Sequence, residues 1–302
     1  MLPFARIAII GLGLLGSSIA RAVKLHMPGA VISGHDNDPQ TSETARALGL
    51  VDHICDQPGT AVVDADLIIL CVPVGAMAEV AASIAADIPP EAVVSDVGSS
   101  KASVLAALTA ALPGHIIIPA HPVAGTERSG PEAGFASLFH NRWCILTPPE
   151  GADSGKVAQL EAFWQRLGAN IEIMDAGHHD LVLAITSHLP HLIAYTIVGT
   201  ASDLESVTRS EVIKYSAGGF RDFTRIAASD PTMWRDVFLN NRDAVLEMLQ
   251  RFSEDLTVLQ RAIRWGDGDM LFDLFTRTRA VRRSIIEQGQ DDDRPDFGRA
   301  DH

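Results

Sequence analysis

Residues 6–21 read Arg6-Ile-Ala-Ile-Ile-Gly-Leu-Gly-Leu-Leu-Gly-Ser-Ser-Ile-Ala-Arg21, and this stretch decides the fold. The apolar run from Ile7 to Ile10 predicts a short buried strand, because a glycine turn follows it at once. Gly11, Gly13 and Gly16 then form the pattern G-x-G-x-x-G, and a helix is expected from Ser17 onward. In such a turn the first glycine permits the tight bend, the second lets the backbone approach a pyrophosphate, and the third lets the helix pack on the strand.

An acidic residue at the end of the next apolar run supports a dinucleotide site. Asp36 follows residues 30–34, about 20 residues after the glycine turn, where a carboxylate can accept a hydrogen bond from an adenosine ribose hydroxyl. The same carboxylate would repel a 2′-phosphate, so NAD is predicted rather than NADP. The expected cofactor contacts are Gly11, Gly13, Leu14, Leu15, Gly16, Asp36, Val72 and Pro73.

The N-terminal stretch also resembles a signal peptide, with an early Arg6, an apolar run and small residues near Ser18. That alternative leaves the glycine spacing and Asp36 unexplained. A cytoplasmic protein is therefore expected.

Composition sets further limits. The 302 residues, 47% apolar and 21% charged, are typical of a globular protein with room for two domains. The net charge of −14 argues against a nucleic-acid partner. The apolar run at residues 67–86 is interrupted by proline, glycine and glutamate, so no membrane span is expected. Three cysteines without metal-binding spacing predict reduced thiols and no metal site.

Strand-like and helical segments alternate up to about residue 175. This alternation predicts an α/β domain over residues 1–175, with a Rossmann-like, doubly wound and mostly parallel sheet. Beyond the first two strands, further strands are expected at residues 66–72, 92–96, 115–119, 142–147 and 171–174, and helices at 41–48, 75–86, 101–112 and 156–167.

Ligands of such sheets bind outside the carboxyl ends of the strands. Val72, Pro73, Ser99 and His121 are each expected just past a strand end. From its position alone, Ser99 suits either a helix N-cap or a catalytic role. His121 lies between two prolines and is not expected to continue a strand; it is either an ordinary loop histidine or one that handles a proton.

From about residue 177 the strand signals stop, and residues 176–288 predict an all-α domain. A long helix at 178–201 should kink at Pro190, and another is expected at 206–215. Asp230 should cap a further helix that has Pro231 in its first turn. The charged tail, residues 289–302, is expected to be disordered.

An apolar stripe follows in the last long helical region. Phe238, Val245, Phe252 and Leu259 recur every seven residues, which is typical of a coiled-coil seam. The stripe could pair with residues 270–286 of the same chain or with a second copy. A homodimer formed through the helical domain is expected.

Four motifs resemble one family. They are Asp96-Val-Gly-Ser-Ser-Lys101, His121-Pro-Val-Ala-Gly-Thr-Glu-Arg-Ser-Gly130, Ser187-His-Leu-Pro-His191 and Gly218-Gly-Phe-Arg-Asp-Phe-Thr-Arg-Ile-Ala-Ala-Ser-Asp-Pro-Thr-Met-Trp234. With the glycine turn, they resemble the prephenate/arogenate dehydrogenases of tyrosine biosynthesis. The resemblance implies a Rossmann-like domain, an all-α dimerisation domain, and NAD-dependent oxidative decarboxylation of prephenate or arogenate.

The resemblance also implies roles for single residues. His121 matches the catalytic histidine that takes the proton of the ring hydroxyl, and Ser99 matches a serine that contacts the same hydroxyl, with Ser100 as the neighbouring alternative. Arg225, an ordinary surface arginine on the plainest interpretation, matches the arginine that binds a substrate carboxylate. Activity should fall as the pH drops through the pKa of His121, because the base must start neutral. The other matched substrate-site residues are His191, Thr126, Glu127, Asp222 and Trp234.

Other functions remain open at this point. A hydroxyacid dehydrogenase of the 6-phosphogluconate-like group would use a lysine of the second domain, for which Lys214 is available. An NAD-sensing regulator would need a basic DNA-binding segment, which the sequence lacks. A dimerising scaffold would explain the apolar stripe but not the residues near the strand ends. Prephenate and arogenate differ by a keto and an amino group, and the sequence does not choose between them.

Overall fold

The computed structural model describes residues 2–126, 128–203, 214–215 and 217–287. The chain forms two compact units, Met1–Leu246 and Glu247–His302.

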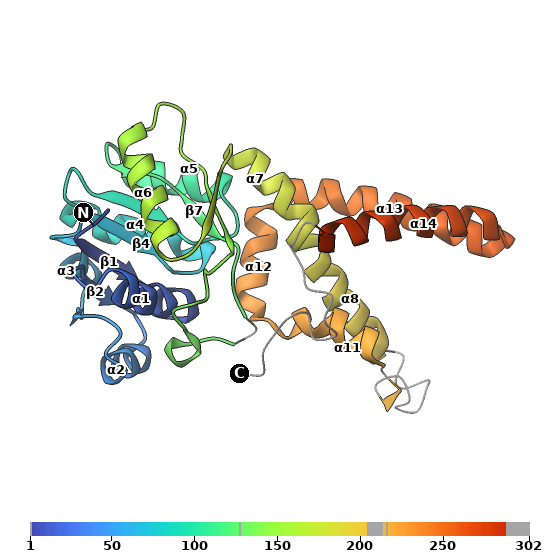
Figure 1. Ribbon diagram of the computed structural model, residues 1–302, viewed down its shortest axis with the longest axis horizontal. Helices are drawn as coiled ribbons and strands as arrows, with labels where there is room; N and C mark the ends of the chain where they lie inside the picture. Colours follow the sequence, from blue (N-terminus) through green and yellow to red (C-terminus); the bar gives the residue numbers. More distant parts are fainter. Residues whose placement is uncertain (1, 127, 204–213, 216, 288–302) are drawn as a thin grey trace. The chain divides into compact units, whose positions relative to one another are not determined.

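The first unit is built on a six-stranded parallel sheet with strand order β3-β2-β1-β4-β5-β6 (Figure 1). Because the chain runs outward from β1 in one direction and from β4 in the other, the topological switch point lies between these two strands. The predicted doubly wound parallel sheet is thus confirmed. The strands are β1 (Arg6–Ile10), β2 (Val31–His35), β3 (His53–Ile54), β4 (Leu67–Leu70), β5 (Val93–Asp96) and β6 (Ile116–Ile117).

Helices cover both faces of this sheet, which is why its central strands are continuous apolar runs. Ile7 and Ile9 of β1 belong to one core cluster, whereas Ala8 and Ile10 belong to the cluster on the opposite face. The covering elements are α1 (Leu14–His26), α2 (Pro39–Ala47), α3 (Pro58–Val62), η1 (Val74–Ala76), α4 (Met77–Ile84), η2 (Ala85–Asp87), α5 (Ala102–Ala111) and α6 (Ser154–Arg166).

A second, three-stranded sheet corrects two expectations. It consists of β7 (Ala120–Pro122), β8 (Trp143–Leu146) and β9 (Asn170–Ile173), with β7 antiparallel to β8 and β8 parallel to β9. The strands predicted around residues 142–147 and 171–174 therefore lie outside the main sheet. The chain also changes sheets at Pro119, between β6 and β7. His121 follows the end of β6, as expected, but it lies within β7, paired with Ile145, so the expectation that it would not continue a strand was wrong.

The helical part of the first unit begins with α7 (Ala176–Leu183), continues through a π-helical turn, η4 (Ala184–His188), and runs on as α8 (Leu189–Asp203). The distortion expected at Pro190 falls on the preceding turn, because proline lacks an N–H and its ring crowds the carbonyl four residues earlier. By length and composition alone Ala176–Asp203 could cross a membrane, but a single such helix is weak evidence. The stretch also carries the buried polar residues His179, Asp180 and His188.

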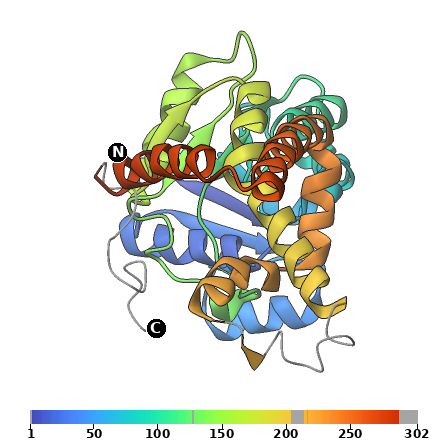
Figure 2. The same ribbon diagram turned by 90° about the vertical axis from the view of Figure 1, so that its right-hand side faces the viewer.

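Among the described residues, the helical part of this unit continues with α11 (Gly218–Thr224), η5 (Arg225–Ala228) and α12 (Pro231–Asn240). α8 packs against α11 and η5 (Figures 1 and 2). α12 packs against η1, which belongs to the part of the first unit that contains the two sheets, called the sheet domain below. The predicted cap is confirmed, since Asp230 accepts a hydrogen bond of 2.8 Å from the Met233 N–H. Residues 206–213 of a predicted helix and the tail 289–302 lie outside the described residues.

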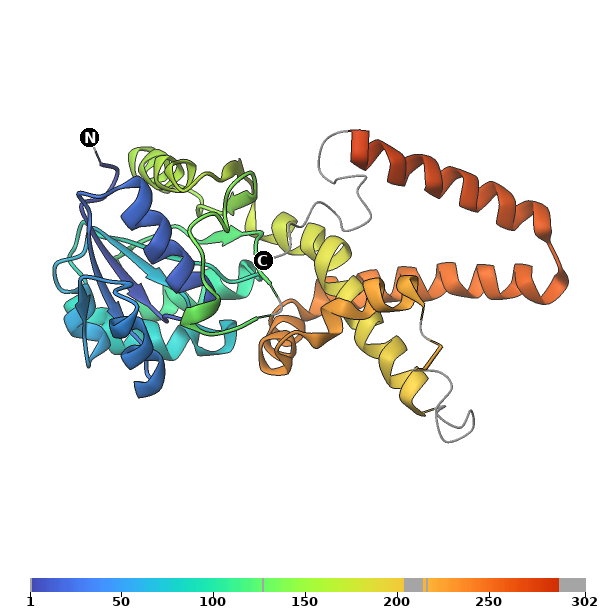
Figure 3. The ribbon, with the colours of Figure 1, turned by 60° about the horizontal axis from the view of Figure 1, so that its bottom comes forward.

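The second unit contains most of α13 (Arg242–Trp265) and all of α14 (Gly268–Glu287), which diverge from the turn between them (Figure 3). The predicted apolar stripe is not carried by one helix, because α12 ends at Asn240 and α13 begins at Arg242. Large apolar side chains on the two helices are exposed: Leu256, Val258, Ile263, Trp265, Phe272, Phe275 and Val281.

Candidate functional site

The glycine turn after β1 has the shape that a diphosphate requires. Gly11 has a positive φ of +98°, and a Cβ there would lie 2.4 Å from the Cys71 carbonyl oxygen. A Cβ on Gly16 would lie 1.9 Å from the Gly11 carbonyl oxygen, whereas a Cβ on Gly13 would meet nothing within 4 Å. The N-terminus of α1 has no side-chain cap, so its N–H groups are available to an anion.

The remaining predicted cofactor residues gather at the same end of the sheet. Asp36 follows β2 and accepts a hydrogen bond of 2.7 Å from the Leu12 N–H, which holds its carboxylate against the glycine turn. Val72 and Pro73 follow β4, the neighbour of β1 across the switch point. Leu14 and Leu15 form the first turn of α1 and are half-buried. These groups fit a dinucleotide with a free ribose 2′-hydroxyl.

His121 is the first member of a buried chain of three polar side chains. Its Nδ1 lies 2.8 Å from Nε2 of His179, and Nδ1 of His179 lies 2.8 Å from Oδ1 of Asp180. Burial lowers the pKa of His121 well below its usual value, and the nearby His179, Lys101 and His188 lower it further. His121 is therefore a neutral imidazole. Within the described part of the chain, no group of three or more His, Cys, Asp or Glu residues is arranged to hold a metal ion.

A buried ion pair supports the strand that carries His121. Lys101 and Asp96 have fully buried side chains and are hydrogen-bonded to each other. The Lys101 ammonium also donates to the Ala120 carbonyl oxygen at 2.8 Å, and Asp96 accepts from the N–H groups of Gly98 and Ala120. Burial raises the pKa of Asp96 and lowers that of Lys101, while their attraction opposes both shifts. The pair thus fixes the residue directly before His121.

The helix cap expected from Ser99 is supplied by a different residue. Both carboxylate oxygens of Asp180 accept hydrogen bonds at the start of α5, at 2.7 Å from the N–H of its N-cap residue Lys101 and 2.9 Å from the Ala102 N–H. The helix-cap interpretation of Ser99 was therefore wrong. Ser99 is half-buried, whereas Ser100 is fully buried and its hydroxyl has no hydrogen-bond partner among the described residues.

His188 was not singled out from the sequence, although it stands in one of the recognised motifs. The Asn241 side-chain nitrogen donates to the Asp180 carbonyl oxygen at 2.8 Å and lies 3.0 Å from Nδ1 of His188. Because a carbonyl only accepts, this nitrogen is a donor, so Nδ1 of His188 accepts and Nε2 carries the proton. The Ser99 backbone lies close enough to the His188 ring to raise its pKa slightly by hydrogen bonding. Burial lowers the pKa of His188 to about 4 and keeps it neutral.

Three residues expected near the substrate lie together. The His191 ring stacks on Trp234, with centroids 3.6 Å apart, and the buried indole N–H of Trp234 lacks a partner within the described residues. Burial lowers the pKa of His191, and so, to a smaller extent, does the positive charge of the half-buried Arg225. His191, Trp234 and Arg225 thus form one side of the candidate site.

The other predicted substrate residues are exposed or lie outside the described residues. Thr126 is exposed and accepts a hydrogen bond of 3.2 Å from the Arg128 N–H of its own loop. Asp222 is exposed on α11, in the turn before Arg225. Glu127 lies outside the described residues.

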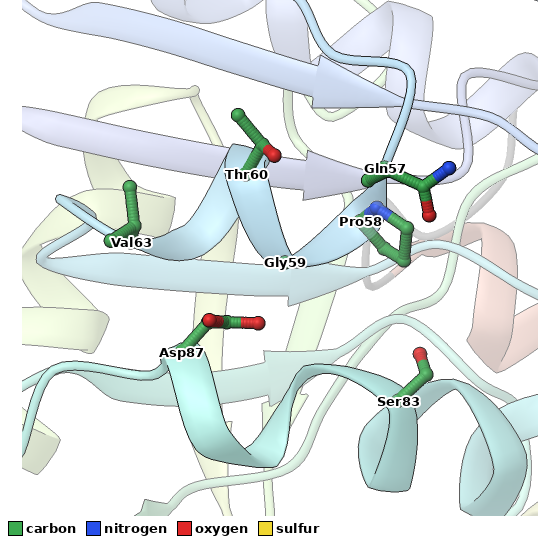
Figure 4. Close-up of a pocket in the computed structure, with 7 residues that line it drawn as sticks. All are labelled: Gln57, Pro58, Gly59, Thr60, Val63, Ser83 and Asp87. Atoms are coloured by element: carbon green, nitrogen blue, oxygen red, sulfur yellow. The ribbon is translucent and has the colours of Figure 1, made fainter.

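A cavity of about 380 Å³ lies elsewhere, beside α3 and η2 (Figure 4). It contains none of the residues predicted for the site. Its lining residues are Gln57, Pro58, Gly59, Thr60, Val63, Ser83 and Asp87.

Comparison with known proteins shows where this chain belongs. Two family models match: "Prephenate dehydrogenase, nucleotide-binding domain" over residues 19–173 and "Prephenate dehydrogenase, dimerization domain" over residues 175–277. The chain is 46% identical to the cyclohexadienyl dehydrogenase of Zymomonas mobilis, covering 94% of this chain and 97% of that one. It is 34% identical to the prephenate dehydrogenase of Bacillus subtilis, covering 92% and 76% of the two chains.

A solved structure agrees with the sequence matches. The crystal structure of prephenate dehydrogenase from Aquifex aeolicus, in complex with hydroxyphenyl propionate and NAD+, superimposes with a TM-score of 0.87 at 30% identity. The match covers 94% of this chain and 98% of that one. The family models together span most of the chain, and the relatives agree with them over nearly its full length. This chain therefore belongs to the prephenate dehydrogenase family.

Proposed function

We propose that this protein is an NAD-dependent dehydrogenase that oxidises and decarboxylates prephenate, arogenate or both in tyrosine biosynthesis. The observation that carries this function is the neutral, buried His121 in the sheet domain, joined through His179 to the helical part that holds Arg225. Lys214, the lysine that a 6-phosphogluconate-like enzyme would need, is exposed and lies over the Tyr215 ring.

The glycine turn, the first turn of α1 and Asp36 would hold the NAD diphosphate and ribose. When bound, NAD accepts a hydride from the substrate. The protein's task is to orient the substrate ring and to handle its proton and charge. Asp36 favours NAD over NADP because its negative carboxylate would repel the 2′-phosphate of NADP.

His121 supplies the base in this reaction. As the hydride leaves ring C4, His121 takes the proton of the hydroxyl on that carbon, and a carbonyl develops there. The ring carboxylate then leaves as carbon dioxide, and the electron pair of the broken C–C bond moves through the ring to the carbonyl oxygen. The protonated His121 can return its proton to that oxygen, which completes an aromatic phenol.

Parallel assays test the function itself. Purified protein should form NADH with prephenate, arogenate or both, and each reaction should run faster with NAD than with NADP because of Asp36. Absence of turnover with both substrates and both cofactors, in protein that is folded and binds NAD, would overturn the proposal.

Arg225 would bind a substrate carboxylate, because its guanidinium can donate two parallel hydrogen bonds. Arg225→Ala should raise the substrate KM about 10- to 150-fold, since a charge-assisted hydrogen bond contributes about 1.5–3 kcal/mol. The change in kcat should be much smaller. Steady-state kinetics at saturating NAD measures both constants.

Arg166→Ala serves as a matched control, because Arg166 is an exposed arginine on α6 of the sheet domain. It should leave both constants unchanged. An Arg225→Ala protein with the KM of the wild type would remove Arg225 from the site.

Ser99 would donate or accept a hydrogen bond at the substrate hydroxyl. Ser99→Ala should lower kcat by about tenfold, the loss of roughly 1.4 kcal/mol. Ser100→Ala is the comparison, because Ser100 is the next residue and its hydroxyl is buried. This substitution should leave kcat within about twofold of the wild type. A kcat that falls in Ser100→Ala and not in Ser99→Ala would reverse the assignment.

The domain limits, the assembly and the location belong to the same proposal. Residues 1–175 would form the NAD-binding domain, and 176–288 the substrate and dimerisation domain. A homodimer would cover the exposed apolar side chains of α13 and α14, and the matching family model is described as a dimerization domain. The protein would act in the cytoplasm.

A further inference from the structure

We infer that His179 and Asp180 are positioning residues that decide which ring nitrogen of His121 carries its proton. This inference rests on the proposed role of His121 as the base. The three residues stand in one hydrogen-bonded chain, from Nδ1 of His121 through the His179 ring to Oδ1 of Asp180.

The direction of the hydrogen bonds starts at Asp180. Its Oδ1 and Oδ2 already accept from the backbone N–H groups of Lys101 and Ala102. Both oxygens therefore act as hydrogen-bond acceptors at this place in the fold. Nδ1 of His179, 2.8 Å from Oδ1, must therefore carry a proton and donate it.

The same rule applies one step further along. Burial lowers the pKa of His179, so its ring is neutral and its Nε2 has a lone pair. Nδ1 of His121 lies 2.8 Å from that lone pair and must be the donor. The single proton of His121 is then on Nδ1, and its Nε2 is the nitrogen that is free to take a proton from the substrate.

The charges around His121 explain why the direction of these hydrogen bonds affects the reaction. Once His121 has taken a proton, it becomes an imidazolium near the ammonium of Lys101 and the rings of His179 and His188. Asp96 offsets the charge of Lys101, to which it is paired. Asp180, at the end of the chain, is the carboxylate that the hydrogen bonds connect to His121 and that stabilises the imidazolium.

The hydrogen bonds of Asp180 also join two parts of the first unit. Asp180 belongs to α7, whereas the N–H groups that it binds are those of Lys101, the N-cap residue of α5, and Ala102, its first residue. One carboxylate therefore caps a helix of the sheet domain and anchors the histidine chain at the same time. If Asp180 had only a structural role, its hydrogen bonds to α5 would be sufficient. Substitutions at His179 leave Asp180 in place and therefore separate the structural role from the positioning role.

The test compares His179→Leu with His179→Gln. Leucine removes the acceptor for Nδ1 of His121, whereas glutamine offers an amide oxygen that can accept in its place. His179→Leu should lower kcat at least about tenfold, up to the roughly 10²- to 10⁴-fold worth of a general base, with the Kd for NAD unchanged. His179→Gln should recover most of this loss. Equal kcat in His179→Leu and wild type would overturn the inference.

Nitrogen NMR of protein labelled with ¹⁵N-histidine gives a second readout that needs no turnover. The His121 signals, assigned by their absence in His121→Asn, should show the proton on Nδ1 in the wild type and a shift toward Nε2 in His179→Leu. A wild-type protein with the proton on Nε2 would contradict the inference even if His121 proves to be the base. Conversely, a His121→Asn enzyme with wild-type kcat would refute the proposed role of His121 as the base, whichever tautomer the spectra show.

Discussion

His121→Asn should lower kcat about 10²- to 10⁴-fold, which is the usual contribution of a general base. Asparagine keeps a polar side chain in β7 but cannot take up a proton at neutral pH. The substrate KM and the Kd for NAD should change little, because the glycine turn and Arg225 are untouched. Pre-steady-state and steady-state rates, with the Kd for NAD from calorimetry, measure these effects.

His26→Asn is the matched control, since His26 is an exposed histidine at the end of α1. It should have wild-type kinetics. His121 is buried, so the thermal midpoint of His121→Asn must be measured as well. A folded His121→Asn protein with kcat within a factor of ten of the wild type would show that another group accepts the proton.

Lys101→Met should lower the free energy of unfolding by about 3–5 kcal/mol. The substitution leaves the buried Asp96 carboxylate without its ammonium and removes the hydrogen bond to the Ala120 carbonyl oxygen. The double variant Asp96→Asn with Lys101→Met should recover part of the loss, because no unpaired charge is then buried. Urea denaturation, followed by circular dichroism, compares the three proteins.

Lys24→Met gives the corresponding measurement for an exposed pair. Lys24 lies 3.3 Å from Asp52, with both side chains 39% exposed, and such pairs contribute about 0–1 kcal/mol. If Lys101→Met were as stable as Lys24→Met, the buried pair would not support β7 as described.

The sheet domain was predictable because its strands are set by local patterns. Residues 7–10 of β1 and all of β4 are buried between the two layers of helices and therefore appear as short continuous apolar runs. The glycine turn and Asp36 were found from the sequence for a related reason, since close backbone approaches leave a fixed spacing of glycines. Of the catalytic candidates, His121 was found through its motif, although its place in a strand was not.

The features that sequence reasoning missed depend on contacts between distant residues. Asp180 caps a helix that begins 78 residues earlier in the chain, and nothing near Asp180 indicates this partner. Asn241, the C-cap residue of α12, lies between the two helices that share the heptad stripe, and its side chain contacts Asp180 and His188. The change of sheets at Pro119 depends on the pairing of β7 with β8, which comes later in the chain. Local propensity carries no information on such pairings.

The most direct test of the whole account is a crystal structure of the protein with NAD and hydroxyphenyl propionate, the pair of ligands seen in the Aquifex aeolicus relative. Nε2 of His121 should lie within about 3 Å of the analogue's ring hydroxyl, on the side of the ring that faces the nicotinamide. The carboxylate of the analogue should contact residues of the helical part of the first unit. A complex in which the hydroxyl is held by other groups, with His121 directed away from the nicotinamide, would contradict the account.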